Sequence, residues 1–189
     1  MAELEQLSVS SVLSLFTLRS VYILGYAWLF GMAFWVTFIG GFIAFKALPR
    51  QQFGALQHKT FPIYFGISML LGSGLLGLWS YGHPAVLEFA TVPQIADVAQ
   101  AYIIASVILA QATNQFVIGP LVNKTMFRRW KQEKDEGKQA TDADISAEMK
   151  ALNRKFAKLH GISSLANLHA VLALAFHGLW IANKGLGSL

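Results

Sequence analysis

The sequence contains no cysteine and few charged residues. Without cysteine the chain can form no disulfide, thiol nucleophile, iron–sulfur cluster or cysteine-ligated zinc site. Charged residues make up only 13% of the 189 residues, whereas about 25% is typical of a soluble domain. A soluble fold of this size needs more ionised groups to cover its surface, so the composition favours a membrane protein.

Long stretches without a charged residue make up most of the chain. An α-helix crosses the hydrocarbon core of a bilayer with about 20 residues, and each of these stretches is longer than that. Buried helices of a soluble bundle are the alternative, but they would need a much larger protein around them. We therefore predict an all-α integral membrane protein, a single domain over residues 1–189. Its bundle of four transmembrane helices comprises residues 20–45, 60–87, 98–123 and 159–183.

Lysine and arginine are distributed unevenly between the two sides of such a bundle. The segments 46–59 and 124–158 share one side and carry every lysine and arginine except Arg19 and Lys184. The positive-inside rule places that side in the cytosol and both termini on the non-cytosolic side. Residues 124–158 are predicted to be a charged cytosolic segment of two helices that breaks near Gly137. The pI near 9.6 then reflects topology, and we expect no nucleic acid as a partner.

The uncharged residues 7–18 near the N-terminus could be mistaken for a signal peptide. A signal peptide begins with basic residues, whereas Glu3 and Glu5 precede this stretch, and no small-residue cleavage pattern follows it. We expect the segment to be retained, either as a helix at the membrane interface or as an extension of the first span.

The residues between Pro49 and Pro62 are predicted to form a loop that folds tightly on the membrane surface. It is either a rigid turn or a contact for lipid headgroups, because its cations lie at headgroup depth. Cations after the third span could contact anionic lipids in the same way, or could belong to a solvated helix face. The candidate headgroup contacts are Arg50, Lys59, Lys124, Arg128, Arg129 and Lys131.

Polar side chains within the predicted spans fall at similar depths. Counted from the cytosolic ends at about 1.5 Å per residue, one polar residue of each span lies roughly 14–16 Å deep, and others lie within a turn. Unpaired polar groups in hydrocarbon cost several kcal/mol. The layer is either a hydrogen-bonded clasp or the lining of a small polar site or permeation path. It comprises Thr37, Ser68, Gln111, Asn114, Gln115, Asn167 and His169.

Histidine within a span can bind a metal ion or haem. His169 and His177 are eight residues apart, which separates them by about 80° around a helix and about 12 Å along it. One ion therefore cannot bind both, and a site would need a ligand on another helix, for which His83 is the candidate. We predict no cofactor, with haem or metal bound through these histidines as the alternative.

The predicted spans contain no carboxylate, lysine or arginine. Proton pumping and hydrolysis within a membrane normally need such ionisable groups. Ser163, Ser164 and His169 are close in sequence, but neither a nucleophile-elbow pattern nor an acidic partner accompanies them. An enzyme is therefore the less favoured interpretation.

Two segments carry a distinctive pattern. Residues 35–69 read WVTFIGGFIAFKALPRQQFGALQHKTFPIYFGISM, and residues 158–168 read KLHGISSLANL. Both resemble the eukaryotic transmembrane protein 205 family, a small four-helix membrane domain of poorly defined function. The resemblance implies a loose link to drug tolerance and vesicular export, without an agreed catalytic residue set. The chain is also similar to bacterial four-helix proteins with copper-resistance and haem-binding members, but the lack of cysteine and of methionine clusters argues against copper.

These observations predict a small polytopic membrane protein that handles a small molecule or lipid in transport or export, or that serves as a scaffold subunit. The alternative is a haem- or metal-binding redox protein that uses its histidines. The expected partners are the lipid bilayer, anionic lipids, and either other membrane subunits or further copies of the chain. An endomembrane or the plasma membrane is favoured over a mitochondrial membrane.

Overall fold

The structure is a computed structural model and describes residues 7–189. Four long helical segments are each long and apolar enough to cross a membrane. They are α2 (Leu18–Phe34) with η1 (Trp35–Gly40) and α3 (Gly41–Ala47), then α4 (Arg50–Gly82), then α6 (Ala96–Thr113) with η2 (Asn114–Ile118) and α7 (Gly119–Glu136), and finally α8 (Ala147–Lys184). Two short helices are α1 (Val9–Leu13) and α5 (Ala85–Glu88). No strand occurs in residues 7–189, so the predicted all-α fold with four spans is confirmed.

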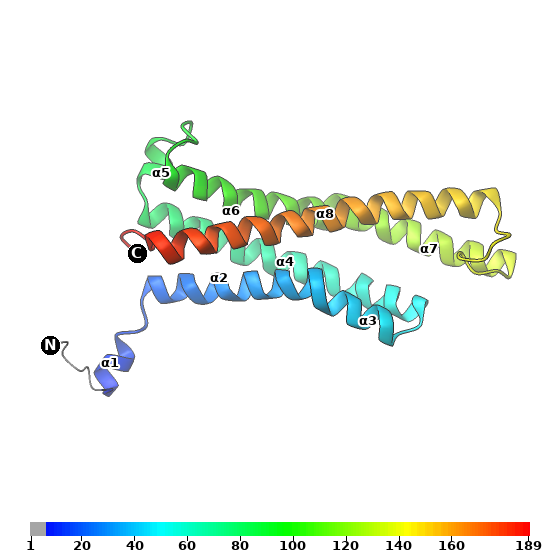
Figure 1. Ribbon diagram of the computed structural model, residues 1–189, viewed down its shortest axis with the longest axis horizontal. Coiled ribbons are helices and arrows are strands. Elements are labelled where there is room, and N and C mark those ends of the chain that lie inside the picture. The colour runs from blue at the N-terminus through cyan, green and yellow to red at the C-terminus, as the bar shows by residue number, and fades with distance from the viewer. Residues whose placement is uncertain (1–6) are drawn as a thin grey trace.

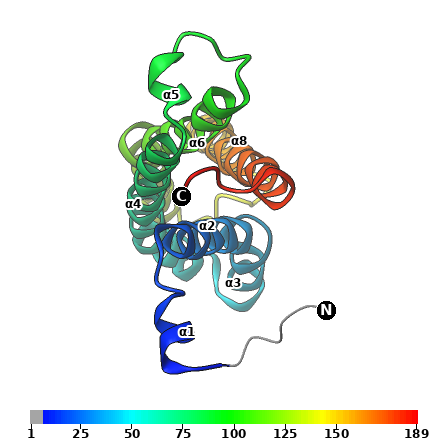
Figure 2. The same ribbon diagram turned by 90° about the vertical axis from the view of Figure 1, so that its left-hand side faces the viewer.

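Successive long segments run antiparallel and pack as a ring of four (Figures 1 and 2). In this ring α2 contacts α4 and α8, and α6 contacts the same two helices. The α3–α4 and α7–α8 connections lie at one end of the bundle, which we call the basic end, while α1 and Leu189 lie at the opposite, terminal end (Figure 1). Short connections between antiparallel neighbours are the usual arrangement in helix bundles.

The connection between the first two spans is shorter than the sequence suggested. Leu48 has the extended backbone that a following proline favours, and α4 begins at Arg50, directly after Pro49. Pro62 then lies inside α4. The prediction of a surface loop between Pro49 and Pro62 is therefore wrong. A proline removes only one backbone donor, and a well-packed transmembrane helix tolerates that loss.

At the terminal end the chain does not enter its first span directly. The short helix α1 is followed by a break, and the Thr17 side chain then caps α2 by accepting a hydrogen bond from the Ser20 backbone N–H. Of the two alternatives for residues 7–18, an extension of the first span is wrong, because α1 ends at Leu13 and the Thr17 cap starts a new helix at Leu18. A helix at the membrane interface stays a prediction. Glu3 and Glu5 lie outside the described residues.

At the basic end a short turn separates α7 from α8. Gly137 has the left-handed backbone (φ +64°) that ends α7, which confirms the predicted break, and the Ser146 side chain caps α8. The turn is held by an ion pair between Lys138 and Asp144. The Lys138 hydrogen bond lowers the pKa of the Asp144 carboxyl below its usual 3.8, and Asp144 raises the pKa of Lys138 above 10.5.

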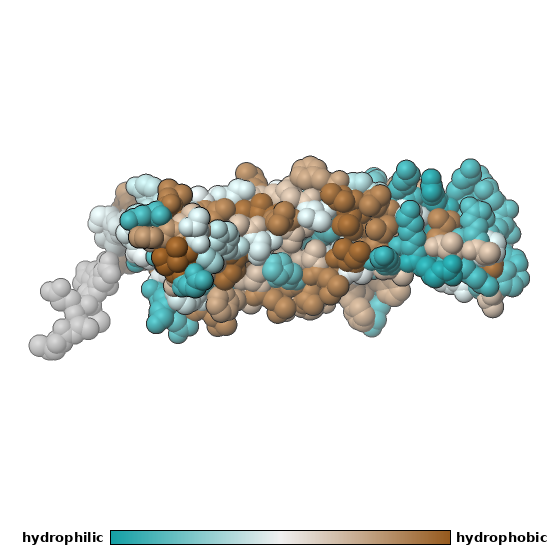
Figure 3. Space-filling model, turned by 90° about the horizontal axis from the view of Figure 1, so that it is seen from above, coloured by the Kyte–Doolittle hydropathy of each residue, from teal (hydrophilic) through white to brown (hydrophobic). Residues whose placement is uncertain are grey.

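Buried apolar residues are concentrated in the part of the bundle toward the terminal end, which we call the packed half. Tyr22, Leu29, Trp79, Ile104 and Leu174 are at most 3% exposed there. The outside of the bundle carries large apolar side chains instead, as the brown middle section of Figure 3 shows. Hydrophilic residues gather at the basic end of the same view. This surface suits a molecule whose middle section contacts lipid.

Candidate functional site

The other part of the bundle, toward the basic end, is hollow. A cavity of about 800 Å³ lies between η1, α3, α4, η2, α7 and α8, and we call this part the hollow half. Pockets that bind small molecules typically measure about 300–1,000 Å³. Aromatic side chains form much of the wall, and these are Phe38, Phe42, Phe45, Phe53, Phe61, Phe65, Trp130 and Phe156.

Two π-helical segments line the inner end of this cavity. The first, η1, contributes Thr37, and the second, η2, contributes Asn114 and Gln115. A π-helical turn interrupts the regular α-helical bonding and is found frequently at functional sites. Both π-helical segments line the same cavity, although they belong to two different spans. We therefore treat η1 and η2 as parts of one site.

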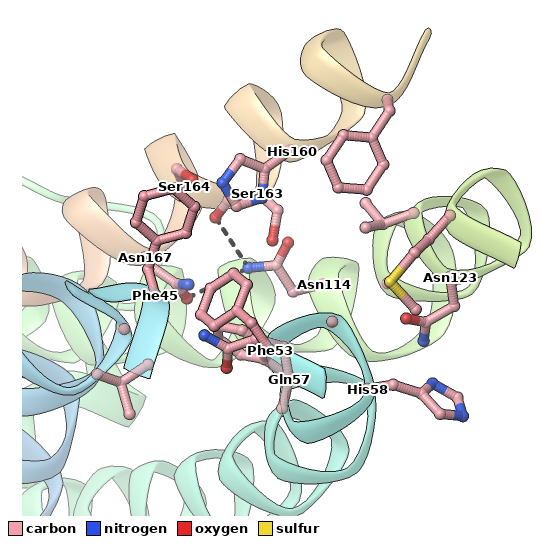
Figure 4. Close-up of a pocket in the computed structure, with 18 of the residues that line it drawn as sticks. Phe45, Phe53, Gln57, His58, Asn114, Asn123, His160, Ser163, Ser164 and Asn167 are labelled. Atoms are coloured by element: carbon pink, nitrogen blue, oxygen red, sulfur yellow. Dashed lines mark hydrogen bonds between the residues drawn. The ribbon is translucent and has the colours of Figure 1, made fainter. Parts of the chain in front are cut away.

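Asn114 is the best-buried polar residue of the cavity. Its side-chain nitrogen donates to the Ser163 carbonyl oxygen at 3.2 Å and to the Asn167 Oδ1 at 3.3 Å, which ties the third span to α8 (Figure 4). The Asn114 Oδ1 and the Thr37 hydroxyl oxygen are both buried and have no hydrogen-bond partner in residues 7–189. Buried polar groups are usually paired, so unpaired ones beside a cavity suggest that a further molecule completes them.

Gln57 and Phe53 on α4 approach the same space as Asn114, and Phe45 on α3 approaches it from the side (Figure 4). Amides and hydroxyls thus occupy the inner end, and aromatic rings separate them from the surface. A few polar groups that converge within an apolar wall are typical of ligand pockets, where the polar groups fix the orientation of the bound molecule.

Two arginines line the outer end of the cavity. Arg50 forms an ion pair with Glu133, which is only 7% exposed. The Arg129 Nε donates to the Asn153 Oδ1 at 2.8 Å, and the guanidinium lies over the Phe156 ring. These contacts hold both cations at the mouth of the cavity, and two arginines against one carboxylate leave an excess of positive charge.

One side of the cavity is open on the outside of the bundle. Helix α3 contacts η1 and α4 but not α8, so these two walls are separate at the basic end. Phe42 and Phe45 on α3 are 61% and 60% exposed, and His160 and Ser164 on α8 are exposed across from them. All four line the cavity, which therefore opens sideways between α3 and α8.

The predicted polar layer is divided by the structure. Thr37, Asn114, Gln115 and Asn167 line the cavity. Ser68 and Gln111 are fully buried but lie outside the cavity lining, and the Gln111 amide donates to the Tyr64 hydroxyl at 3.3 Å.

His169 does not join the other residues of the predicted layer. It is exposed on the outside of the bundle, where its ring pairs with the Ser106 hydroxyl at 3.0 Å. Counting residues along a helix does not give the direction that a side chain faces. Asn167, two positions earlier, faces inward, and a separation of two residues turns a helix by about 200°.

The predicted headgroup contacts fall into two groups, those that line the cavity and those that do not. Arg50 and Arg129 line the cavity, whereas the other four cations are exposed and do not. Those four are Lys59, Lys124, Arg128 and Lys131.

The histidine candidates lie in the packed half or on its surface. His177 is fully buried and uses both ring nitrogens, one with the Tyr22 hydroxyl at 2.6 Å and the other with the Gln100 Oε1 at 2.8 Å. His83 stacks on Trp79 with ring centroids 3.8 Å apart. Within residues 7–189 no group of three or more metal-binding side chains is assembled. Haem or metal bound by His177 would have to break one of its hydrogen bonds.

Sequence reasoning missed Gln100 and Tyr22. Gln100 was identifiable, because Gln100, Ile104, Val107, Gln111 and Asn114 recur at spacings of three and four and form one face of the third span. All five are buried in the structure. Tyr22 begins a series with Tyr26, Phe30 and Phe34 at spacings of four, and nothing in that series distinguishes the buried Tyr22 from the more exposed members.

Comparison with known proteins gives a consistent picture. The family described as "Domain of unknown function (DUF4149)" matches residues 24–131. The chain is 25% identical to Transmembrane protein 205 of Danio rerio over 174 residues, which cover 85% of this chain and 88% of that protein. This similarity confirms the predicted resemblance. No solved structure matches the chain.

Proposed function

The chain belongs to the DUF4149 family, and from this premise we propose that it handles a small amphiphilic molecule or lipid in the cavity of its hollow half. The observation that carries the proposal is the convergence of two π-helical segments and an incompletely paired Asn114 on one cavity. A scaffold subunit would have no need for a hollow interior, because helices in lipid associate by close packing.

The position of the cavity supports a ligand that comes from the bilayer. Asn153 and Asn167 on α8 mark its outer and inner ends, and 14 residues of helix span about 21 Å. Half of a bilayer with its headgroups is about 20–22 Å thick. The cavity therefore has the length of one leaflet, and its opening between α3 and α8 would admit a molecule laterally.

A continuous path across the membrane is not part of this proposal. The packed half closes the far end of the cavity with bulky core residues and with the hydrogen-bonded Tyr22, Gln100 and His177. Export would require these helices to rearrange, whereas binding and release into one leaflet would not.

Filling the cavity tests the proposal. Replacing Ser163 with Phe places a ring in the cavity from the α8 wall, and it should abolish binding of monopalmitoylglycerol to the purified full chain in native mass spectrometry. The matched control is Leu165→Phe, because Leu165 is 66% exposed on the same helix and does not line the cavity. Equal binding by both variants and the unmodified chain would contradict the proposal.

We further propose that the basic end faces the cytosol, since it carries nearly all of the lysine and arginine. The absence of cysteine permits a direct measurement with single-cysteine variants. In intact cells a membrane-impermeant maleimide should label Ser188→Cys and not Lys138→Cys if the membrane is the plasma membrane, and in sealed organelle vesicles the pattern should reverse. Labelling of both sites from the same side would contradict the topology.

A further inference from the structure

We propose that the molecule bound in this cavity is an anionic amphiphile, with its acidic headgroup at Arg50 and Arg129 and its hydrocarbon chain along the aromatic wall toward the opening between α3 and α8. This inference rests on the proposed function and specifies its ligand. The starting observation is that both arginines line the outer end of a cavity whose remaining wall is largely aromatic.

The charges at the mouth are not balanced. Among residues 7–189, Glu133 is the single carboxylate that lines either of the two cavities to which Arg50 belongs. Its Oε1 is already engaged by Arg50 and by the Ala140 backbone N–H, and its Oε2 is buried without a partner in the same residues. The terminal nitrogens of Arg129 donate no hydrogen bond within residues 7–189, since only its Nε is engaged. The planar guanidinium can bind a carboxylate or phosphate through two parallel hydrogen bonds, which makes arginine well suited to this role.

Arg129 is held in place before any ligand arrives. The Asn153 side chain that accepts from its Nε also donates to the Ala140 carbonyl at 2.7 Å, and this links Arg129 to the α7–α8 turn. The Phe156 ring lies 4.5 Å from the guanidinium carbon. A cation fixed in this way loses little conformational entropy when it binds an anion, which raises the affinity for a matching ligand.

A second cavity of about 510 Å³ adjoins the first at Arg50 and Trp130, which line both. Its other walls include Lys134 and the first turn of α4. No side chain caps that turn, so the free N–H groups at the start of α4 add to the positive potential around Arg50. A headgroup at the mouth of the first cavity therefore lies beside a second polar space that has room for it.

The size of the first cavity and its aromatic wall suit a hydrocarbon chain better than a soluble anion. A free phosphate would need only the arginines, and it would leave most of the roughly 800 Å³ without a function. An amphiphile would occupy both the aromatic part of the cavity and its mouth. Its chain would pack against the apolar wall, and its headgroup would pair with the two arginines.

Three probes with one hydrocarbon chain length and different headgroup charge test the inference in native mass spectrometry of the full chain. They are hexadecyl phosphate (anionic), monopalmitoylglycerol (neutral) and hexadecyltrimethylammonium (cationic). The unmodified chain should bind hexadecyl phosphate about tenfold more tightly than monopalmitoylglycerol, because one charged hydrogen bond is worth that much. Equal affinity for all three would overturn the inference and leave the proposed function intact, while failure of all three to bind would contradict the proposed function itself.

The variants assign the preference to the two arginines. Two variants are needed, and the first is Arg129→Gln. The second combines Arg50→Gln with Glu133→Gln, so that no carboxylate is left buried and unpaired. Each variant should reduce binding of hexadecyl phosphate to the level of monopalmitoylglycerol. Binding of the neutral probe should persist, which shows that the variants fold. The matched control is Arg128→Gln, since Arg128 is exposed on the same helix and does not line the cavity. A preference that survives both arginine variants overturns the inference.

Competition with inorganic phosphate distinguishes a site for an amphiphile's headgroup from a site for a soluble anion. Inorganic phosphate should fail to displace hexadecyl phosphate at concentrations a hundred times higher than the probe, because it gains nothing from the aromatic wall. Displacement by phosphate at the concentration of the probe would show a site for a soluble anion and would overturn the assignment of an amphiphile.

Discussion

A buried histidine in the packed half and a buried asparagine in the hollow half differ in how fully their polar atoms are paired. In the packed half, His177 has a partner on each ring nitrogen, from α2 on one side and α6 on the other. In the hollow half, the Asn114 Oδ1 has no partner in the described part of the chain and lies beside a cavity of about 800 Å³. A satisfied polar group fixes how helices pack, whereas an unsatisfied one beside open space is available to a ligand.

The backbone follows the same division. Through the packed half the long helices are regular, but two of them change to π-helix at η1 and η2, where the hollow half begins. Gly40 and Gly119 end these segments, and a side chain at Gly119 would lie 2.6 Å from the Asn114 carbonyl oxygen. The sequence therefore favours π-helical backbone at η1 and η2, between the packed half and the cavity.

The largest effect is expected from breaking the packed half. Replacing His177 with Leu should lower the free energy of unfolding in detergent by about 2–3 kcal/mol, because the Tyr22 hydroxyl and the Gln100 side chain both lose a buried partner. His169→Leu is the control on the same helix, and it should change stability by less than about 0.5 kcal/mol because His169 is exposed. Equal destabilisation by the two variants would show that the structure assigns the histidines to the wrong faces.

A smaller effect is expected where the two halves meet. Gly119→Ala should cost about 1–2 kcal/mol and weaken binding of monopalmitoylglycerol, because the added Cβ would push the Asn114 carbonyl and distort η2. Gly66→Ala is the matched control, since a Cβ there meets nothing within 4 Å and alanine favours a helix. Thermal unfolding and native mass spectrometry measure the two consequences, and an unaffected G119A variant would contradict the π-helical geometry.

Within the hollow half, Asn114→Leu should cost about 1 kcal/mol, since the Asn167 side chain loses its donor. Asn114→Leu combined with Asn167→Leu should cost less than the single change, because the double variant leaves no Asn167 amide without its donor. Both variants should reduce ligand binding if the layer is a site. Unchanged binding alongside the stability loss would make this pair a structural clasp like that around His177.

The smallest effect is expected at the exposed α7–α8 turn. The lowered pKa of Asp144 means that its pairing with Lys138 persists at neutral pH and is lost only as the pH falls below 3.8, while the raised pKa of Lys138 keeps the pair intact up to at least pH 10.5. Asp144→Asn should therefore speed amide hydrogen exchange in the turn at pH 7 without a measurable change in global unfolding. Global destabilisation by this change would mean that the turn is coupled to the cavity.

Much of the fold was predictable from local features of the sequence. Uncharged stretches gave the four spans, and Gly137 gave the end of α7. Asn114 and Asn167 were expected near one level, and they lie within hydrogen-bonding distance. The α4 start at Arg50 was not predictable from charge, because a membrane-spanning helix can carry charged residues once it reaches the headgroups.

The sequence by itself determined that this chain is an integral membrane protein with four helical spans, and it placed Asn114 and Asn167 near one level. These properties depend on solvation and helix rise, which act residue by residue. Only the tertiary structure decided that His177 is buried and His169 exposed, and that Arg50 and Arg129 share the mouth of one cavity with Asn114 at its inner end. The direction of each side chain and the space between helices depend on how all four helices pack against one another, and no local pattern records that packing.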